Sequence, residues 1–112
     1  MPLSRPRILI AEDLYLVAMP VCEALESSGA EVVGPFSSRA ETLAAIENES
    51  IDVAILDVGL ADGFAFPAAR ELRRRGVPFL FLTGYDPEMV PQEFAGVPIV
   101  MKPTSAERVC QR

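Results

Sequence analysis

Four short apolar runs divide the chain, and none of them alternates between polar and apolar residues. They are Arg7–Ala11, Val53–Leu56, Phe79–Leu82 and Val97–Met101. Unbroken runs of this length are typical of strands that are buried on both faces of a parallel sheet. A fifth run, Glu31–Phe36, contains Gly-Pro and predicts a strand at the edge of the sheet, because proline cannot donate a hydrogen bond to a neighbouring strand.

Three segments between these runs have the apolar spacing of helices. They are Leu14–Ser28, Ser38–Asn48 and Phe64–Arg75. Gly29 is placed to end the first helix and Gly76 to end the third. Pro20 falls inside the first helix, so we expect a kink there or a helix that begins near Met19. The apolar residues of the second helix are expected to share one face: Ala40, Leu43, Ala44 and Ile46.

The last third of the chain departs from this regular alternation. The segment Gly84–Gly96 contains Pro87 and Pro91, and each proline removes a backbone donor. We therefore expect a loop with at most one helical turn in place of a fourth helix. Only Thr104–Arg112 remain for a short last helix, which would leave apolar surface near the first helix uncovered. Such a patch predicts a homodimer or a docked partner.

The order of strands and helices predicts one α/β domain over residues 1–112, with a doubly wound parallel sheet between two helical layers. In folds of this kind the ligand site lies beyond the carboxyl ends of the strands, where the strand order reverses. The residues at those strand ends are therefore the first candidates for chemistry.

Composition and charge narrow the function classes. With 16 acidic and 10 basic residues the formal net charge is −6, which argues against direct nucleic-acid binding. No apolar run approaches the ~20 residues of a membrane-spanning helix, and no signal-peptide core is present, so we expect a cytoplasmic protein without membrane contact.

The chain lacks histidine, which excludes histidine-based catalysis. Cys22 and Cys110 are interpreted as small core residues, and the arginines between positions 70 and 75 as a solvated helix end.

Polar side chains stand where the predicted central strands end. Glu12 and Asp13 follow the first run, Asp57 the next, and then come Thr83 and Lys102. Each has an ordinary interpretation, since acids before helices are commonly caps and Thr-Gly or Lys-Pro commonly marks a turn. Together they indicate a site, because parallel strands end at the same edge of a sheet.

The residue types favour phosphoryl chemistry with a metal ion. Three carboxylates at close range repel one another, and a divalent cation removes that penalty. An all-oxygen set suits Mg²⁺, for which the carbonyl of Gly59 is a further candidate ligand. A carboxylate such as Asp57 is then a competent nucleophile toward phosphorus. Thr83 and Lys102 would contact the phosphoryl oxygens.

Four stretches in this order, ILIAED, VAILDV, FLFLTGYD and IVMKP, resemble the receiver domains of two-component response regulators. The resemblance implies a flavodoxin-like fold with five parallel strands in the order 2-1-3-4-5. It also implies that Asp57 is the phosphoacceptor and that Glu12 and Asp13 are the acidic pair that holds Mg²⁺. Asp57 and the carbonyl of Gly59 would complete the metal site.

The same resemblance assigns phosphate binding and switching to Thr83, Gly84 and Lys102, and it implies a cis peptide bond before Pro103. The stretch PFLFLTGYD is similar to the subgroup called FAT GUY regulators, whose members are commonly stand-alone. Ile99 occupies the position at which receivers usually have a switching aromatic residue, so the usual switch cannot operate. Tyr85 is the candidate replacement.

The resemblance implies a signalling domain rather than an enzyme. Asp57 would accept a phosphoryl group from a histidine kinase or phosphotransfer protein, and the domain would signal by protein contact without an output domain of its own. The alternative is a pseudo-receiver that uses the same fold as a constitutive interaction module. A phosphatase of the haloacid dehalogenase type is disfavoured, because it has a second acid two residues after its nucleophile, where this chain has Gly59.

Overall fold

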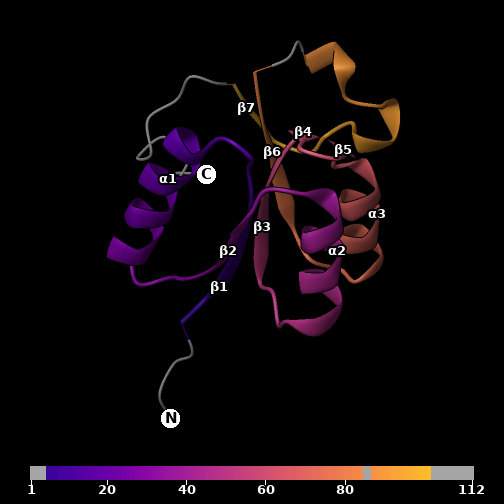
Figure 1. Cartoon of the computed structure of the whole chain (residues 1–112). Coiled ribbons are helices and arrows are strands. Elements are labelled where there is room, and N and C mark those ends of the chain that lie inside the picture. The colour runs from indigo at the N-terminus through magenta and orange to yellow at the C-terminus, as the bar shows by residue number, and fades with distance from the viewer. Residues whose placement is uncertain (1–4, 85–86, 102–112) are drawn as a thin grey trace.

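The fold is built on a five-stranded parallel sheet, shown in Figure 1. The computed structural model describes residues 5–84 and 87–101. The strands are β1 (Arg7–Ala11), β2 (Glu31–Phe36), β3 (Val53–Asp57), β6 (Phe79–Thr83) and β7 (Ile99–Met101). Their order in the sheet is β2-β1-β3-β6-β7, with β2 at the edge. This confirms the predicted flavodoxin-like order 2-1-3-4-5.

Helices cover both faces of the sheet. Helix α1 (Tyr15–Ser27) lies on one face, and α2 (Arg39–Asn48) and α3 (Phe66–Arg74) lie on the other (Figure 1). Alternate strand residues point to opposite faces, so Ile10 packs toward α1 while Leu9 joins the core beneath α2 and α3. Each central strand is buried on both sides, which is why its sequence is apolar without a break.

Helix α1 begins before Met19, which was one of the two starts or shapes expected from Pro20. It starts at Tyr15, with Pro20 inside it, so the predicted start near Met19 is wrong. Pro20 has no N–H, so the carbonyl of Leu16 loses its hydrogen-bond donor within the helix. Because both residues are exposed, water is able to donate to that carbonyl instead. The predicted end at Gly29 is confirmed: Gly29 has a φ of 95°, and the N–H of Ala30 donates to Leu25 O in the manner of a Schellman motif.

The two helices on the other face differ in detail from their predictions. Helix α3 starts at Phe66 rather than Phe64, because Gly63–Phe64 forms β5, which pairs antiparallel with β4 (Gly59–Leu60). In α2 the buried residues are Thr42, Ala45 and Ile46, whereas Ala40 and Ala44 are exposed. The apolar residues of α2 therefore do not all share the buried face, as the sequence pattern had suggested.

The proline-containing segment has little regular structure, as predicted. It contains two single 3-10 turns, η1 (Pro87–Met89) and η2 (Gln92–Phe94), so the expected maximum of one turn was too low. Phe94 of η2 is buried in the core. Several predictions fall outside the described residues: those for Tyr85, Lys102, Pro103, Cys110 and the helix Thr104–Arg112.

Cys22 is a buried free cysteine in the core beside α1, which agrees with its interpretation as a small core residue. Burial raises the pKa of its thiol. None of the helices in the described part of the chain is long and apolar enough to cross a membrane.

Candidate functional site

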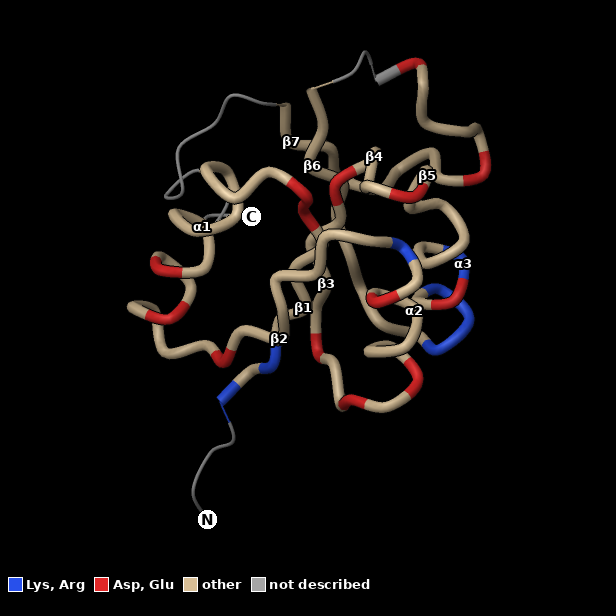
Figure 2. The backbone as a smooth tube through the Cα atoms, viewed as in Figure 1, with Lys and Arg blue, Asp and Glu red and all other residues tan. Residues whose placement is uncertain are grey.

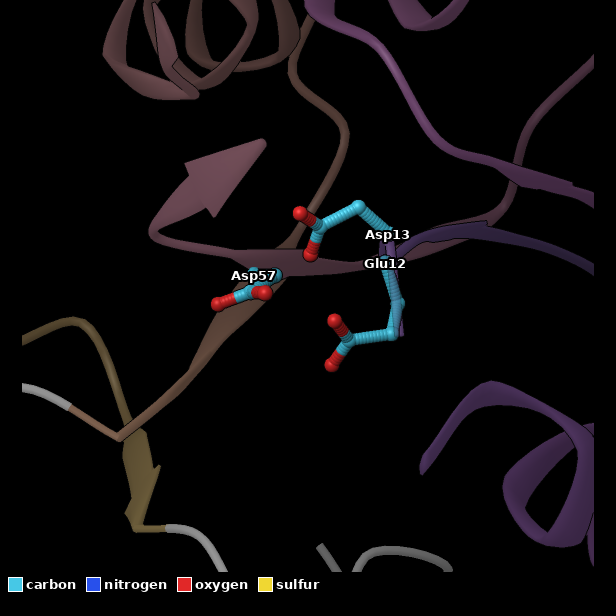
Figure 3. Close-up of side chains that lie close together, drawn as sticks. All are labelled: Glu12, Asp13 and Asp57. Carbon is cyan, nitrogen blue, oxygen red and sulfur yellow. The ribbon is translucent and has the colours of Figure 1, made fainter. Parts of the chain in front are cut away.

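Three carboxyl groups come together at the carboxyl ends of β1 and β3. Glu12 and Asp13 directly follow β1, and Asp57 is the last residue of β3. These strands are parallel neighbours, with Ala11 opposite Leu56, so their ends meet at one edge of the sheet. One carboxylate oxygen from each residue lies within 4.8 Å of the others, as Figure 3 illustrates. In the backbone view acidic positions gather at the top of the central strands (Figure 2).

The three acids differ in their surroundings. Glu12 and Asp57 are each only 3% exposed, whereas Asp13 is exposed. Glu12 Oε2 accepts a hydrogen bond from the Leu14 N–H at 3.1 Å. Asp57 Oδ1 accepts a long one, at 3.4 Å, from the N–H of Gly59. Two buried acids and one that water reaches therefore share a single site.

This donor set fits a divalent cation. Ionised carboxylates at this separation repel one another, and burial of two of them raises the cost of charge. A hard cation with oxygen ligands offsets both effects, and Mg²⁺ typically takes one or two carboxylates and keeps several waters. Asp13 is exposed, so an ion can reach the site from solvent.

The predicted hydroxyl lies on the neighbouring strand. Thr83 is the last residue of β6, is fully buried, and follows Leu82, which pairs with Asp57 across the sheet. Gly84 is exposed in a bend directly after it. Ile99 opens β7 opposite Phe81 and packs against the core beneath α2 and α3.

Gly59 lies at the start of the β4–β5 hairpin, two residues after Asp57. Sequence reasoning missed what holds this hairpin in place. The carboxylate of Asp62 accepts hydrogen bonds from the N–H groups of Arg39 and Ala40, at the start of α2. The only sequence signal was the Asp-Gly pair at 62–63, which is typical of a hairpin turn but does not identify a distant partner.

An apolar depression of about 690 Å³ lies elsewhere, beside the amino-terminal starts of β6 and β7. Val77, Pro78, Val97 and Pro98 line it, together with neighbouring residues of α3 and η2. Since the acids stand at the opposite, carboxyl ends of the strands, this depression is separate from the acidic site.

The sequence of this chain is similar to known receiver proteins. The family model described as "Response regulator receiver domain" matches residues 8–112. The transcriptional regulatory protein PdtaR of Mycobacterium tuberculosis is 34% identical over 80 residues, which is 70% of this chain and 39% of that protein. The chain thus spans about two fifths of the length of this curated relative.

Two solved structures extend the comparison over nearly the whole chain. The solution structure of SdrG from Sphingomonas melonis has a TM-score of 0.83 and 37% identity, covering 96% of this chain and 92% of SdrG. The response regulator PhyR from Brucella abortus has a TM-score of 0.79 and 34% identity, covering 95% of this chain and 45% of PhyR. With the matched sequence, the strand order and the acidic strand ends in agreement, the chain belongs to the response regulator receiver domain family.

Proposed function

We propose that this receiver domain accepts a phosphoryl group on Asp57 and signals through contact with other proteins. The observation that carries the proposal is the convergence of the Glu12, Asp13 and Asp57 carboxylates within 4.8 Å at the strand ends. A fold that served only as a binding module would have no need for two acids buried beside each other at that edge.

In this proposal Glu12, Asp13 and Asp57 hold Mg²⁺ through carboxylate oxygens, and the carbonyl of Gly59 is a further ligand. When bound, the ion offsets negative charge on the acids and on the phosphoryl oxygens. The hydrogen bonds from Leu14 to Glu12 and from Gly59 to Asp57 limit the freedom of both side chains. The acids are thereby oriented before the ion arrives.

The transfer step itself belongs to Asp57. A carboxylate oxygen of Asp57 forms the new bond to phosphorus, and the bond between phosphorus and the donor's leaving atom breaks, with its electron pair passing to the donor. The hydroxyl of Thr83 donates to a phosphoryl oxygen, which connects the modified site to β6 and to the bend at Gly84. The ammonium of Lys102 contributes positive charge to the same oxygens.

Receiver domains exchange phosphoryl groups with histidine kinases or phosphotransfer proteins and act on downstream partners, and we propose the same for this chain, in the cytoplasm. The chain covers 92% of SdrG, so receivers similar to this one occur as chains of about this length. The match to less than half of PhyR and PdtaR shows that related receivers also occur within longer proteins.

Intact mass measurement after incubation with acetyl phosphate and Mg²⁺ tests the proposal. We expect the wild type to gain one phosphoryl group, and we expect Asp57→Asn or a chelator to prevent the gain. Asp52→Asn is a matched control, because Asp52 lies just before β3 at the other end of the strand, where it accepts a hydrogen bond from Arg7 N–H. An unmodified wild type, or a modified Asp57→Asn variant, would contradict the proposal.

A further inference from the structure

The hairpin that follows Asp57 is attached to residues 36–40, which comprise the last residue of β2, the connection and the start of α2 and are named the β2–α2 junction. The hydrogen-bonded residues of the hairpin and the junction lie 22 to 25 positions apart in sequence. The link has three parts: the carboxylate of Asp62, the guanidinium of Arg39 and one backbone hydrogen bond from Ala61 to Ser37.

Asp62 caps helix α2 from outside the helix. Its two carboxylate oxygens accept from the N–H groups of Arg39 and Ala40, while the hydroxyl of Ser38 accepts from Glu41 N–H. Three first-turn donors that a helix leaves unsatisfied thus find partners, and two of them use the hairpin. The same N–H groups, that of Arg39 above all, hold the pKa of Asp62 below its usual range, so the carboxylate is ionised at neutral pH.

Arg39 holds the hairpin from its other side. Its Nη1 donates to the carbonyl of Phe64 at 3.2 Å, and the guanidinium lies directly against Gly63. A Cβ at Gly63 would come within 2.9 Å of that nitrogen, and the φ of Gly63 is 138°. Glycine at this position therefore permits both the turn and the close approach of Arg39.

The β2–α2 junction also contacts the acidic pair. Phe36 O accepts from the N–H of Glu12 at 2.9 Å, and Ser37 O accepts from the N–H of Ala61 at 3.0 Å. Successive residues of one short segment thus bind the loop that carries Glu12 and the hairpin that carries Gly59. The junction connects the two halves of the acidic site by a route separate from the pairing of β1 with β3.

We propose that Asp62 and Arg39 are positioning residues for the acidic site. Together they fasten the β4–β5 hairpin to the β2–α2 junction, which fixes Gly59 relative to the three acids and so sets the affinity for Mg²⁺. This inference rests on the proposed function. Mg²⁺ demands near-ideal octahedral geometry, so a hairpin free to shift weakens the site even when every carboxylate is present. Residues that orient metal ligands without touching the metal typically contribute about 10–100-fold in affinity.

Asp62→Asn removes the charge and one of the two acceptor oxygens while keeping the size of the side chain. Asp52→Asn is the matched control, because Asp52 also accepts a backbone hydrogen bond, from Arg7 N–H at 2.7 Å, but at the opposite end of the sheet. We would measure the dissociation constant for Mg²⁺ by calorimetry and, without metal, the urea concentration at the midpoint of unfolding. The expected result is an affinity about 10-fold weaker for Asp62→Asn and within twofold of wild type for Asp52→Asn.

Arg39→Gln provides a second variant should Asp62→Asn fail to fold, since it keeps the backbone N–H groups that bind Asp62 and removes only the guanidinium against Gly63. A weaker Mg²⁺ affinity in Arg39→Gln supports the inference, and an unchanged affinity there overturns it. An unchanged affinity in folded Asp62→Asn, or an equal loss in Asp52→Asn, also overturns it while the proposed function stands. A wild type that binds no Mg²⁺ contradicts the proposed function itself.

Discussion

At the scale of single residues, the two neighbouring acids Glu12 and Asp13 are not equivalent. Glu12 is buried and one of its oxygens already accepts a hydrogen bond from Leu14 N–H. Asp13 is exposed, so its carboxylate is accessible to an ion arriving with its water shell. Under the proposed function we therefore expect Asp13 to contact Mg²⁺ directly and Glu12 to hold it through a water molecule.

We therefore expect Asp13→Ala to weaken Mg²⁺ binding more than Glu12→Ala does. Loss of a direct ligand removes a charge from the ion's first shell, whereas loss of an outer residue typically costs about 10–100-fold in affinity. Calorimetric titration of both variants with Mg²⁺ gives the comparison. Overlapping titration curves would show that Glu12 and Asp13 contribute equally to Mg²⁺ binding and would contradict this prediction.

At the scale of elements, local sequence signals were sufficient for most of the sheet. Continuous apolar runs predicted β1, β3 and β6, and also β7, which starts at Ile99 rather than at the predicted Val97. The run with Gly-Pro predicted β2 at the edge, and Gly29 marked the end of α1 by its required backbone conformation. The start of α3 was missed because Phe64 fits a helical pattern but is held in a hairpin by pairing with Gly59. Likewise, no periodicity could show that Asp62 caps a helix more than 20 residues earlier, since that contact exists only in the folded chain.

For the candidate site, the sequence was informative where chemistry follows a strand end. Glu12, Asp13 and Asp57 could be grouped because parallel strands β1 and β3 had to end together. The depth of Glu12 and the role of the β2–α2 junction could not be predicted, because both depend on packing between segments distant in sequence.

The segment after β6 shows which contacts hold an irregular element. Phe94 of η2 is 1% exposed, and its ring packs against Phe66 and Phe81 with centroid distances of 5.8 and 5.4 Å. Outside this core, the guanidinium of Arg70 binds both oxygens of Glu93, and that of Arg73 lies 4.9 Å from the centre of the Phe94 ring. The buried ring and the exposed ion pair fasten the same turn.

Of these two contacts, we expect the buried Phe94 ring to contribute more to the free energy of unfolding. Removing a buried phenylalanine leaves a cavity, so we expect Phe94→Ala to lower the free energy of unfolding by ~3–5 kcal/mol. The ion pair is partly exposed on both sides, so Glu93→Gln should lower the free energy of unfolding far less than Phe94→Ala does. Urea unfolding of both variants measures this, and similar losses in the two would refute the ranking.

At the scale of the whole molecule, charge is unevenly distributed. Acidic residues are spread over the described chain and include a group at the strand ends, whereas the described basic residues gather mainly around α3 and the start of β1 (Figure 2). The arginines at the end of α3 are on the surface and bind neighbouring acids: Arg70 and Arg73 bind Glu93, while Arg74 and Arg75 bind Glu71. This fits their interpretation as a solvated helix end and leaves the acidic edge free of competing cations from α3.

The Glu71 pairs predict a specific response to acid. Hydrogen bonds from Arg74 and then Arg75 lower the pKa of Glu71 from 4.5 to about 2. Because the folded state favours the ionised form, the resulting stabilisation is complete above pH 4.5 and is lost as the pH falls toward 2. The stability difference between wild type and Glu71→Gln should therefore shrink across that range and should be smaller in high salt. Urea unfolding at a series of pH values tests this, and a difference independent of pH would contradict it.

Asp57, among all the acids of this chain, is the residue that we propose becomes phosphorylated. Borohydride reduction after treatment with acetyl phosphate and Mg²⁺ converts a phosphorylated aspartate to homoserine, and peptide mass mapping then locates the modified residue. We expect homoserine at position 57 alone, dependent on Mg²⁺. Modification at Glu12, Asp13 or another residue, or at no residue while the protein is folded and metal is present, would contradict the account.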